Sequence, residues 1–269
     1  MTKQPDIVFS FGKNWQKFIG SLNKERIRCA EKSLKNMLKV ENLAGKRFLD
    51  AGCGSGIFSL AALRLGAEKV VSFDIDEDSV ACAKYLRERF GPFPQWHITT
   101  GSALDRDFLG NLDKFDIVYS WGVLHHTGKM WDALSNIIIP VTPEGTLFIS
   151  IYNDQGRISR LWRWIKYVYN ISPSPIKMLM AGGYYSIVLV VKAGQGVAKM
   201  QPPSKWFEYG SDRGMNIWHD VVDWIGGYPF ETATPQQIIS FYHKRHFNLM
   251  EKHEKTGTGC NEFVFLYKS

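Results

Sequence analysis

Three glycines at alternate positions follow a short apolar segment that ends in an aspartate. The stretch KRFLDAGCGSG places Gly52, Gly54 and Gly56 after Asp50. Because glycine has no Cβ, such a loop can turn tightly from a strand into a helix and bring main chain close to a ligand. The helix expected at 58–65 would direct its first N–H groups at that ligand. Taken alone, the loop is also compatible with an ordinary tight turn.

Asp74 ends the next apolar segment, about 20 residues after the glycine loop, where nucleotide-binding α/β units place the acid that binds ribose hydroxyls. Asp76 follows closely and is a second candidate. Glu77 and Asp78 more simply favour the N-terminus of the next helix, because they oppose its dipole.

Two adjacent histidines, His125 and His126, follow the fourth apolar segment. Histidine can accept a proton near neutral pH, so the pair is our candidate for a general base. We expect one of them to face the substrate and the other to pack or cap the next helix, with His125 favoured as the base. An adjacent pair is not a ligand set for a metal, and no metal is expected.

Apolar segments alternate with helical segments, which predicts a parallel α/β sheet. The strands are expected at 46–50, 69–74, 95–100, 115–120 and 146–152, followed near the C-terminus by a pair at 247–253 and 262–267. Helices are expected at 58–65, 77–90 and 235–246.

In this order, the motifs resemble those of the class I S-adenosylmethionine (SAM) dependent methyltransferases. The glycine loop is similar to motif I, and the sequence WGVLHHT at 121–127 is similar to motif IV of the branch with Leu-His-His, as in quinone-precursor O-methyltransferases. The resemblance covers 46–153 and 234–269. It implies a Rossmann-like seven-stranded sheet with helices on both faces, and SAM as methyl donor with S-adenosylhomocysteine as product.

The resemblance also implies which residues bind the donor. Asp50 would brace the glycine loop or contact it through water, and Asp74 would bind the ribose. The family's adenine loop reads Gly-Asp-Ala, whereas here Ser102 replaces the acid and can still bond an adenine edge. The complete expected set is Asp50, Gly52, Cys53, Gly54, Gly56, Asp74, Ile75, Ser102, Ala103 and Trp121. Within it, Cys53 is expected to pack, and Trp121 to lie near the adenine.

The chain divides into an N-terminal segment at 1–45, a methyltransferase core at 46–153 and 233–269, and an insertion at 154–232. In the N-terminal segment, Ile27, Ala30, Leu34, Met37 and Leu38 recur at helical spacing and predict a helix at the sheet edge. Residues 9–15 are aromatic and contain a glycine, and we expect them to fold over the bound ligand as a lid.

The insertion is too long to be a plain connection and is rich in aromatic residues. Helices are expected at 158–169 and 176–191. The second segment is apolar but short for a membrane span of about 20 residues. No transmembrane span is therefore expected. The segment is interpreted as a core or interface helix, with contact to a lipid surface as the alternative.

The end of the insertion gathers charges of both signs among aromatic rings, at Arg213, His219, Asp220, Asp223 and Glu231. This composition suits a small polar-aromatic acceptor pocket, and the alternative is a structural loop with capping carboxylates. The acceptor-binding candidates are Tyr152 and Asn153 at the end of the fifth strand, with Arg213, Asp223 and Trp224.

The chain has 269 residues, with 33 Lys and Arg against 26 Asp and Glu, or a net charge of +7. The surplus lies outside the donor half, since residues 1–50 carry +6 and residues 51–153 carry −4. A basic surface suits nucleic acid, anionic lipid or an acidic substrate, but is often only solvated. The four cysteines are too far apart to suggest a disulfide framework or zinc site. Residues 1–10 lack the apolar centre of a signal peptide, so a cytoplasmic location is expected.

The sequence therefore predicts an enzyme that moves a methyl group from SAM to a small-molecule acceptor, at a hydroxyl oxygen. An RNA methyltransferase that docks through the basic N-terminus and insertion is the first alternative. A SAM-binding module without catalysis is the second. A nicotinamide dehydrogenase fits the glycine spacing less well. Acceptor identity and oligomeric state are not determined by these patterns.

Overall fold

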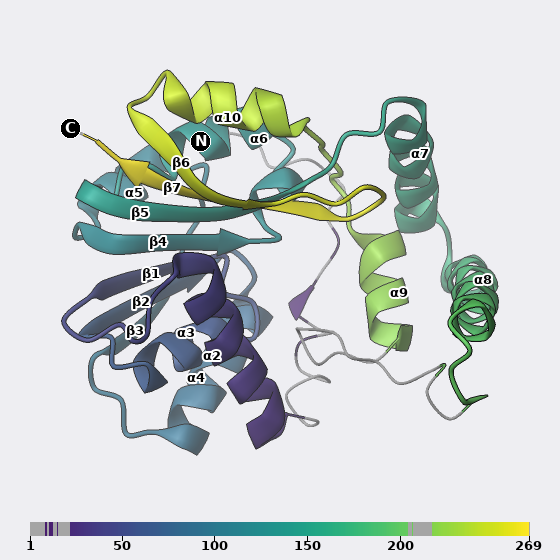
Figure 1. Ribbon diagram of the computed structural model, residues 1–269, viewed down its shortest axis with the longest axis horizontal. Helices are drawn as coiled ribbons and strands as arrows, with labels where there is room; N and C mark the ends of the chain where they lie inside the picture. Colours follow the sequence, from purple (N-terminus) through teal and green to yellow (C-terminus); the bar gives the residue numbers. More distant parts are fainter. Residues whose placement is uncertain are drawn as a thin grey trace.

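The computed structural model describes residues 9, 11, 12, 15, 22–203, 206 and 217–268, with His219 as main chain only. Within this part of the chain, one seven-stranded sheet has the order β3-β2-β1-β4-β5-β7-β6 (Figure 1). The strands are β1 (Arg47–Ala51), β2 (Lys69–Asp74), β3 (Trp96–Thr100), β4 (Phe115–Trp121), β5 (Val141–Tyr152), β6 (Phe247–His253) and β7 (Cys260–Tyr267). Strands β1 to β5 are parallel to one another, whereas β7 is antiparallel to both β5 and β6. The predicted sheet and its antiparallel end are thus confirmed.

Helices cover both faces of the sheet and form a separate group beside it. Those next to the sheet are α2 (Lys24–Leu38), α3 (Ile57–Arg64), α4 (Glu77–Phe90), α5 (Arg106–Asn111), the short 3-10 helix η1 (Leu124–His126), α6 (Met130–Asn136) and α10 (Pro235–His243). The insertion supplies α7 (Arg157–Ile171), α8 (Ser174–Ala198) and α9 (Ile217–Gly226), which lie together on the side toward which β4 points (Figure 1).

Three features of the insertion differ from the prediction. Helix α8 is 25 residues long, so the expected range 176–191 was too short. Only 6% of the most apolar 18-residue stretch of α8 is buried. This contradicts the interpretation as a core helix and leaves that of an interface helix. Helix α9 occupies a region in which no helix was expected and for which a structural loop was the alternative to an acceptor pocket.

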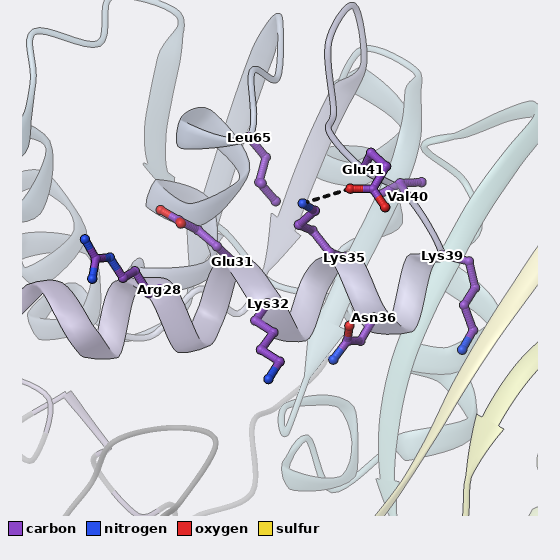
Figure 2. Close-up of a pocket in the computed structure, with 9 residues that line it drawn as sticks. All are labelled: Arg28, Glu31, Lys32, Lys35, Asn36, Lys39, Val40, Glu41 and Leu65. Atoms are coloured by element: carbon purple, nitrogen blue, oxygen red, sulfur yellow. Dashed lines mark ion pairs between the residues drawn. The ribbon is translucent and has the colours of Figure 1, made fainter.

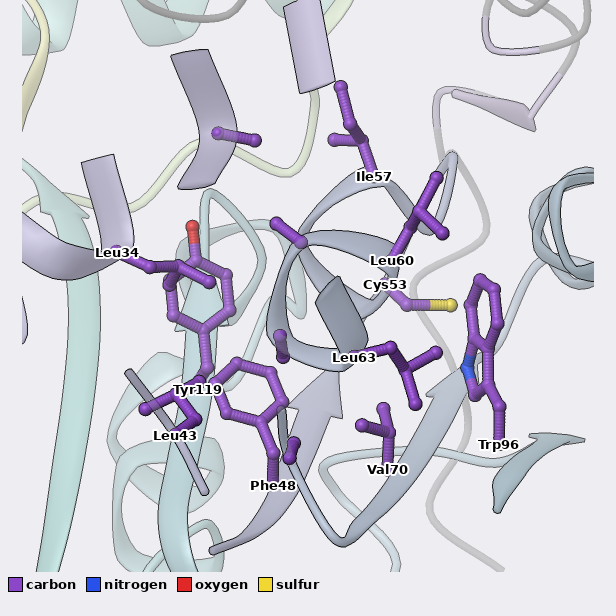
Figure 3. Close-up of a cluster of buried hydrophobic side chains, with 14 of the residues drawn as sticks. Leu34, Leu43, Phe48, Cys53, Ile57, Leu60, Leu63, Val70, Trp96 and Tyr119 are labelled. Carbon is purple, nitrogen blue, oxygen red and sulfur yellow. The ribbon is translucent and has the colours of Figure 1, made fainter. Parts of the chain in front are cut away.

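Neighbouring residues on each strand point to opposite faces of the sheet and enter two different apolar clusters. Phe48 and Tyr119 belong to the cluster that α2 covers through Leu34 (Figure 3). Leu49 and Val118, one position away, belong to the cluster on the other face. Because both faces are covered, the strands are almost continuously apolar, as expected of a parallel sheet.

A chain of buried hydrogen bonds joins three strands to the helix after the glycine loop. The indole of Trp96 in β3 donates to Ser72 in β2 at 2.7 Å. Ser72 and Ser59 of α3 are 2.7 Å apart, and Ser59 donates to the carboxylate of Asp50 in β1 at 2.5 Å. An indole can only donate and a carboxylate can only accept, so the protons all point from Trp96 toward Asp50. These hydrogen bonds fix α3 relative to β1, β2 and β3.

We expect Ser72→Ala to lower the free energy of unfolding by about 1–3 kcal/mol, because it leaves the Trp96 indole buried without a partner. Urea unfolding followed by tryptophan fluorescence would measure the change. Ser186→Ala, at an exposed position of α8, is the matched control and should change stability by less than about 0.5 kcal/mol. Equal effects of the two substitutions would contradict a structural role for the buried chain.

Candidate active site

The glycine loop is held by the end of β2. The N–H groups of Gly52 and Cys53 both donate to the carbonyl of Phe73, at 2.8 and 3.0 Å. The N–H of Gly54 donates to the carboxylate of Asp74 at 2.9 Å. Strand β2 thus sets the shape of the loop that follows β1.

The three glycines have left-handed backbone, with φ of +76° at Gly52, +51° at Gly54 and +79° at Gly56. Space also requires glycine, since a Cβ on Gly52 would lie 2.4 Å from Val123 and one on Gly54 would lie 2.9 Å from Trp15. The loop therefore admits close approach by side chains from two other segments, while its contact with a ligand stays a prediction.

Asp74 has two roles where the sequence suggested one. Its second carboxylate oxygen accepts from the N–H of Asp76 at 3.0 Å, so the side chain braces the loop and the start of α4 together. Burial raises the pKa of the Asp74 carboxyl. Asp50, which was expected to brace the loop, instead binds Ser59 in α3. Burial raises the pKa of Asp50 to about 7.

The remaining residues of the predicted donor site surround the same strand ends. Ile75 is half-exposed directly after β2. The hydroxyl of Ser102 accepts from the N–H of Leu104 at 3.2 Å, and Ala103 is buried beside it. Cys53 packs in the apolar cluster that contains Trp96 (Figure 3), and burial raises its thiol pKa. These positions remain predictions as donor contacts.

Trp121 differs from the expectation. Its indole donates to the carboxylate of Glu262 in β7 at 2.6 Å. In the observed strand order, β7 lies on the opposite side of β4 from β3, which precedes Ser102. The indole thus points away from the loop expected to flank adenine, and we do not retain it as an adenine contact. The cause is an acidic partner that only the β5–β7 pairing brings into reach.

His125 and His126 lie in η1, immediately after β4, with their rings 4.5 Å apart. His126 Nδ1 is 2.7 Å from the carbonyl of Pro229, and a carbonyl only accepts, so Nδ1 carries the proton. His125 is fully buried, and neither ring nitrogen makes a hydrogen bond with a described residue. The main chain of Ser150 raises the pKa of His125, but the effect of burial, which lowers this pKa, is larger.

The expectation that one of these histidines is a base near neutral pH does not agree with their surroundings. Burial lowers the pKa of His126 to about 3 and that of His125 well below its ordinary value. Both rings are neutral at pH 7. They can orient a ligand by hydrogen bonding, but they hold a proton poorly.

Rings from three segments close around the histidines, and we call His125, His126, Tyr152, Trp224 and Phe230 the aromatic cluster. The ring of Tyr152 lies 4.0 Å from His125, 4.9 Å from Phe230 and 5.4 Å from Trp224. Tyr152 and Trp224 were predicted to line the acceptor site, and the structure brings them together with the histidines.

Lys166 of α7 is a residue that the sequence analysis missed. Its ammonium group lies 4.3 Å from the ring centre of Trp224 and 4.8 Å from that of Phe230, and it donates to the Trp224 carbonyl. Burial lowers the pKa of Lys166 to about 7. The available signal was a lysine at helical spacing from Trp162 and Tyr169, on the aromatic side of the helix.

Asn153 was also predicted to contact the acceptor, but its side chain is used elsewhere. The amide of Asn153 donates to the carbonyl of Lys255 at 2.9 Å and accepts from Asn261 at 3.2 Å. Asn153 thus ties β5 to the β6–β7 turn, which contradicts a role in acceptor binding. Asp223 is half-buried in α9, and its carboxylate raises the pKa of Lys166, against the larger effect of burial. Arg213 lies outside the described residues.

Two further charges of that region have different surroundings. Glu231 accepts from the N–H of Met130 at 3.0 Å, so it caps α6, as in the structural alternative we considered. The pKa of Asp220 is raised to about 7, first by burial and then by Asp223.

Phe9, Phe11 and Gly12, near the N-terminus, contact residues of the candidate site. The N–H of Phe9 donates to the carbonyl of Tyr228 at 3.0 Å, and the ring of Phe11 lies 5.0 Å from His126. The N–H of Gly12 donates to Asp76 at 2.9 Å. These contacts join the segment after β2 to the aromatic cluster, and closure over a bound ligand stays a prediction.

An open hollow of about 690 Å³ lies over α2, away from these residues (Figure 2). It is lined by Arg28, Glu31, Lys32, Lys35, Asn36, Lys39, Val40, Glu41 and Leu65. Several of its charges are paired, since Lys35 lies 3.1 Å from Glu41 and Lys39 lies 3.3 Å from Glu251. No predicted site residue lines it, so we keep it apart from the active site.

Residues 22–175 match the family described as a methyltransferase domain, which is more than half of the chain. The chain belongs to this family. A curated relative, the tRNA U34 carboxymethyltransferase of Pseudomonas savastanoi pv. phaseolicola, is 40% identical over 94 residues, or 35% of this chain and 28% of that protein. The ribosomal protein L11 methyltransferase of Photobacterium profundum is 49% identical over 54 residues, or 20% of this chain and 18% of that protein. The match therefore spans less than a third of either relative.

Among solved structures, the magnesium protoporphyrin IX methyltransferase of Synechocystis PCC 6803 with bound SAH is similar in fold, with a TM-score of 0.53. It is 17% identical, and the similarity covers 96% of this chain and 95% of that one. At this level of identity the similarity shows a shared fold. The residues of this chain fit the donor, because the glycine loop after β1 has the left-handed backbone of a tight turn and Asp74 at the end of β2 offers a carboxylate beside it. Among the described residues, no group of three or more His, Cys, Asp or Glu side chains is placed to hold a metal ion.

We expect Asp74→Ala to weaken binding of SAM by about 1.5–3 kcal/mol, roughly 10- to 150-fold in Kd, since a charge-assisted hydrogen bond is lost. Isothermal titration calorimetry with S-adenosylhomocysteine would measure it. Asp107→Ala, an exposed acid on α5, is the control. Unchanged affinity in the folded Asp74→Ala protein would exclude Asp74 from the donor site.

Lys166 predicts a pH dependence of stability. Its folded pKa of about 7 lies below its ordinary value of 10.5, so between these values the unfolded chain binds more protons. Stability linked to Lys166 therefore rises as pH increases from 7 toward 10. We expect Lys166→Met to remove this rise, a difference on the order of 4 kcal/mol at full burial. Urea unfolding of both proteins at pH 7 and pH 10 would measure it. Parallel changes in the two proteins would show that Lys166 is not buried in this way.

Proposed function

We propose that this methyltransferase acts on a hydroxyl oxygen of a small aromatic acceptor that binds at the aromatic cluster. The observation that carries the proposal is a set of buried polar atoms on apolar walls. The indole N–H of Trp224 and both ring nitrogens of His125 make no hydrogen bond with described residues. Buried polar groups are normally paired, so a polar acceptor group is a suitable partner for them.

The walls of the cluster favour a flat, compact acceptor. Rings of Tyr152, Trp224 and Phe230 offer faces and edges on which an aromatic ring can pack. Apolar walls with a few placed polar groups are typical of small-molecule sites. The cluster follows β4 and β5, next to the glycine loop through the contact of Val123 with Gly52.

SAM supplies a methyl group that is already activated by its sulfonium. The protein must hold the acceptor oxygen in line with that methyl and exclude water, and such positioning accounts for much of the rate gain. The closed packing of Phe11 on His126 serves the exclusion of water.

A hydroxyl acceptor must also lose its proton. The histidines were our first candidates, but a pKa of about 3 makes His126 a weak base at neutral pH. Lys166, with a pKa of about 7, touches three rings of the site and suits proton acceptance better. We therefore assign to Lys166 the role of accepting the hydroxyl proton. His125 has the role of hydrogen bonding to the acceptor.

RNA is the second candidate acceptor, because one matching relative is a tRNA U34 carboxymethyltransferase. The basic N-terminal segment would be the docking surface. Against this, lysines of α2 at the hollow are already paired with Glu41 and Glu251.

The deciding experiment is methyl transfer from labelled SAM into a host extract, separated into small-molecule and macromolecular fractions. We expect label in the small-molecule fraction, where mass spectrometry can identify the product and the methylated atom. A Gly52→Val protein is the control, because its side chain would clash with Val123 and block the loop. RNase-sensitive label in the macromolecular fraction would overturn the proposal and favour RNA.

The assignment of the proton is tested once a product is known. We expect Lys166→Met to lower kcat by about 100-fold or more and to remove the rise of rate around pH 7, since general base catalysis typically contributes that much. His126→Gln should keep the same pH profile as the unchanged protein. A profile that moves with His126 and not with Lys166 would reverse the assignment.

A further inference from the structure

Helix α8 presents a continuous apolar face that the rest of the described chain leaves uncovered. Its exposed side chains recur at helical spacing and include Ile176, Leu179, Ile187, Val190, Val191 and Val197. Leu179 is 76% exposed and Val190 is 72% exposed. No charged residue interrupts this face, which runs along most of the helix.

The opposite face of α8 holds the helix against the protein. Ala181 is buried, and the ring of Tyr185 lies 5.4 Å from Trp218 of α9. Gly196 allows Trp206 to pack directly on the helix. The lysines of α8 lie toward this inner side, since Lys177 lies 5.8 Å from the ring centre of Tyr169. The orientation of the apolar face is therefore determined by packing at both ends.

Helix α7 extends the surface and adds positive charge at its edge. Leu161, Trp164 and Ile171 are each more than half exposed. Arg157 and Arg160 are exposed on the same helix. Trp beside Leu and Arg is the composition of helices that lie at a membrane–water interface.

The charge of the whole region has one sign. Residues 155–207 contain eight Lys and Arg and no Asp or Glu. Of these, Arg157 and Arg160 are exposed at the edge of the surface and attract anionic lipid headgroups, while the apolar face supplies burial among acyl chains. A second copy of the chain fits less well, because a symmetric contact would bring the same positive charges together.

We propose that α7 and the outer face of α8 dock this protein on the surface of an anionic lipid membrane. By length and composition alone α8 is long enough to cross a bilayer, with a mean hydropathy of 1.4 in its most apolar window. A span would require the helix to leave its contacts with Tyr169, Trp206 and Trp218. Docking in the plane of the membrane keeps all of them. In Figure 1 the pair lies at the outer side of the insertion, away from the sheet.

The test is flotation of the purified full-length protein with liposomes of phosphatidylcholine alone or with added phosphatidylglycerol. We expect co-flotation with the anionic liposomes, and about tenfold less with phosphatidylcholine alone or at high salt. The double variant Leu179→Glu, Val190→Glu should lose binding to both kinds of liposome, because it places charge on the face that would enter the membrane. Arg157→Gln with Arg160→Gln should weaken only the binding that depends on anionic lipid.

Met250→Glu is the matched control, since Met250 is 61% exposed on β6, outside the docking face. It should float like the unchanged protein. Binding of S-adenosylhomocysteine would show that each variant is folded. Absence of flotation with a concentration-dependent dimer in light scattering would overturn the proposal in favour of self-association. Equal flotation of all variants, or binding that resists alkaline carbonate, would also overturn docking in the plane of the membrane.

Discussion

The buried carboxylate of Asp50 holds the helix after the glycine loop through Ser59, and much of the donor side depends on this hydrogen bond. Ser59 continues to Ser72 and Trp96, so β1, β2, β3 and α3 are joined by side chains as well as by the sheet. A carboxylate that is removed from water must be paired with donors, because an unpaired one would cost far more than the hydrogen bond gains. With α3 fixed, the glycine loop has one shape, and Asp74 and the Phe73 carbonyl can bind its N–H groups from β2.

Burial also determines the chemistry on the acceptor side. Neutral forms are favoured for His126 and Lys166 because the aromatic rings around them exclude water. The same desolvation has opposite consequences for the two residues. It removes the histidine from the pH range in which it would act as a base, and it brings the lysine into that range. A residue type thus indicates a possible role, whereas the surroundings decide whether the role is available at neutral pH.

Several parts of the fold were predictable because they follow from local physics. Alternating apolar segments and helices, the glycine spacing and the acids after β1 and β2 each act over a few residues. Errors arose where distant segments meet. Trp121 was placed by its neighbours in sequence, but β7 supplies Glu262 as its partner. Asn153 ends β5 as predicted, yet its amide is used by the β6–β7 turn. Helix α8 was predicted to be shorter, as a core or interface helix, and it is long with one exposed face, because its neighbours α7 and α9 cover only the other.

By itself the sequence determined the sheet, the donor loop and the class of reaction, since these depend on residue types at short and regular spacing. Only the tertiary structure decided which polar groups share a site. Lys166, Tyr152 and Trp224 come from three separate segments, and their contact depends on how the insertion packs beside β5. The structure likewise decided which face of α8 stays exposed. Hydropathy gives the composition of a helix, but burial of one face depends on the elements that pack against it.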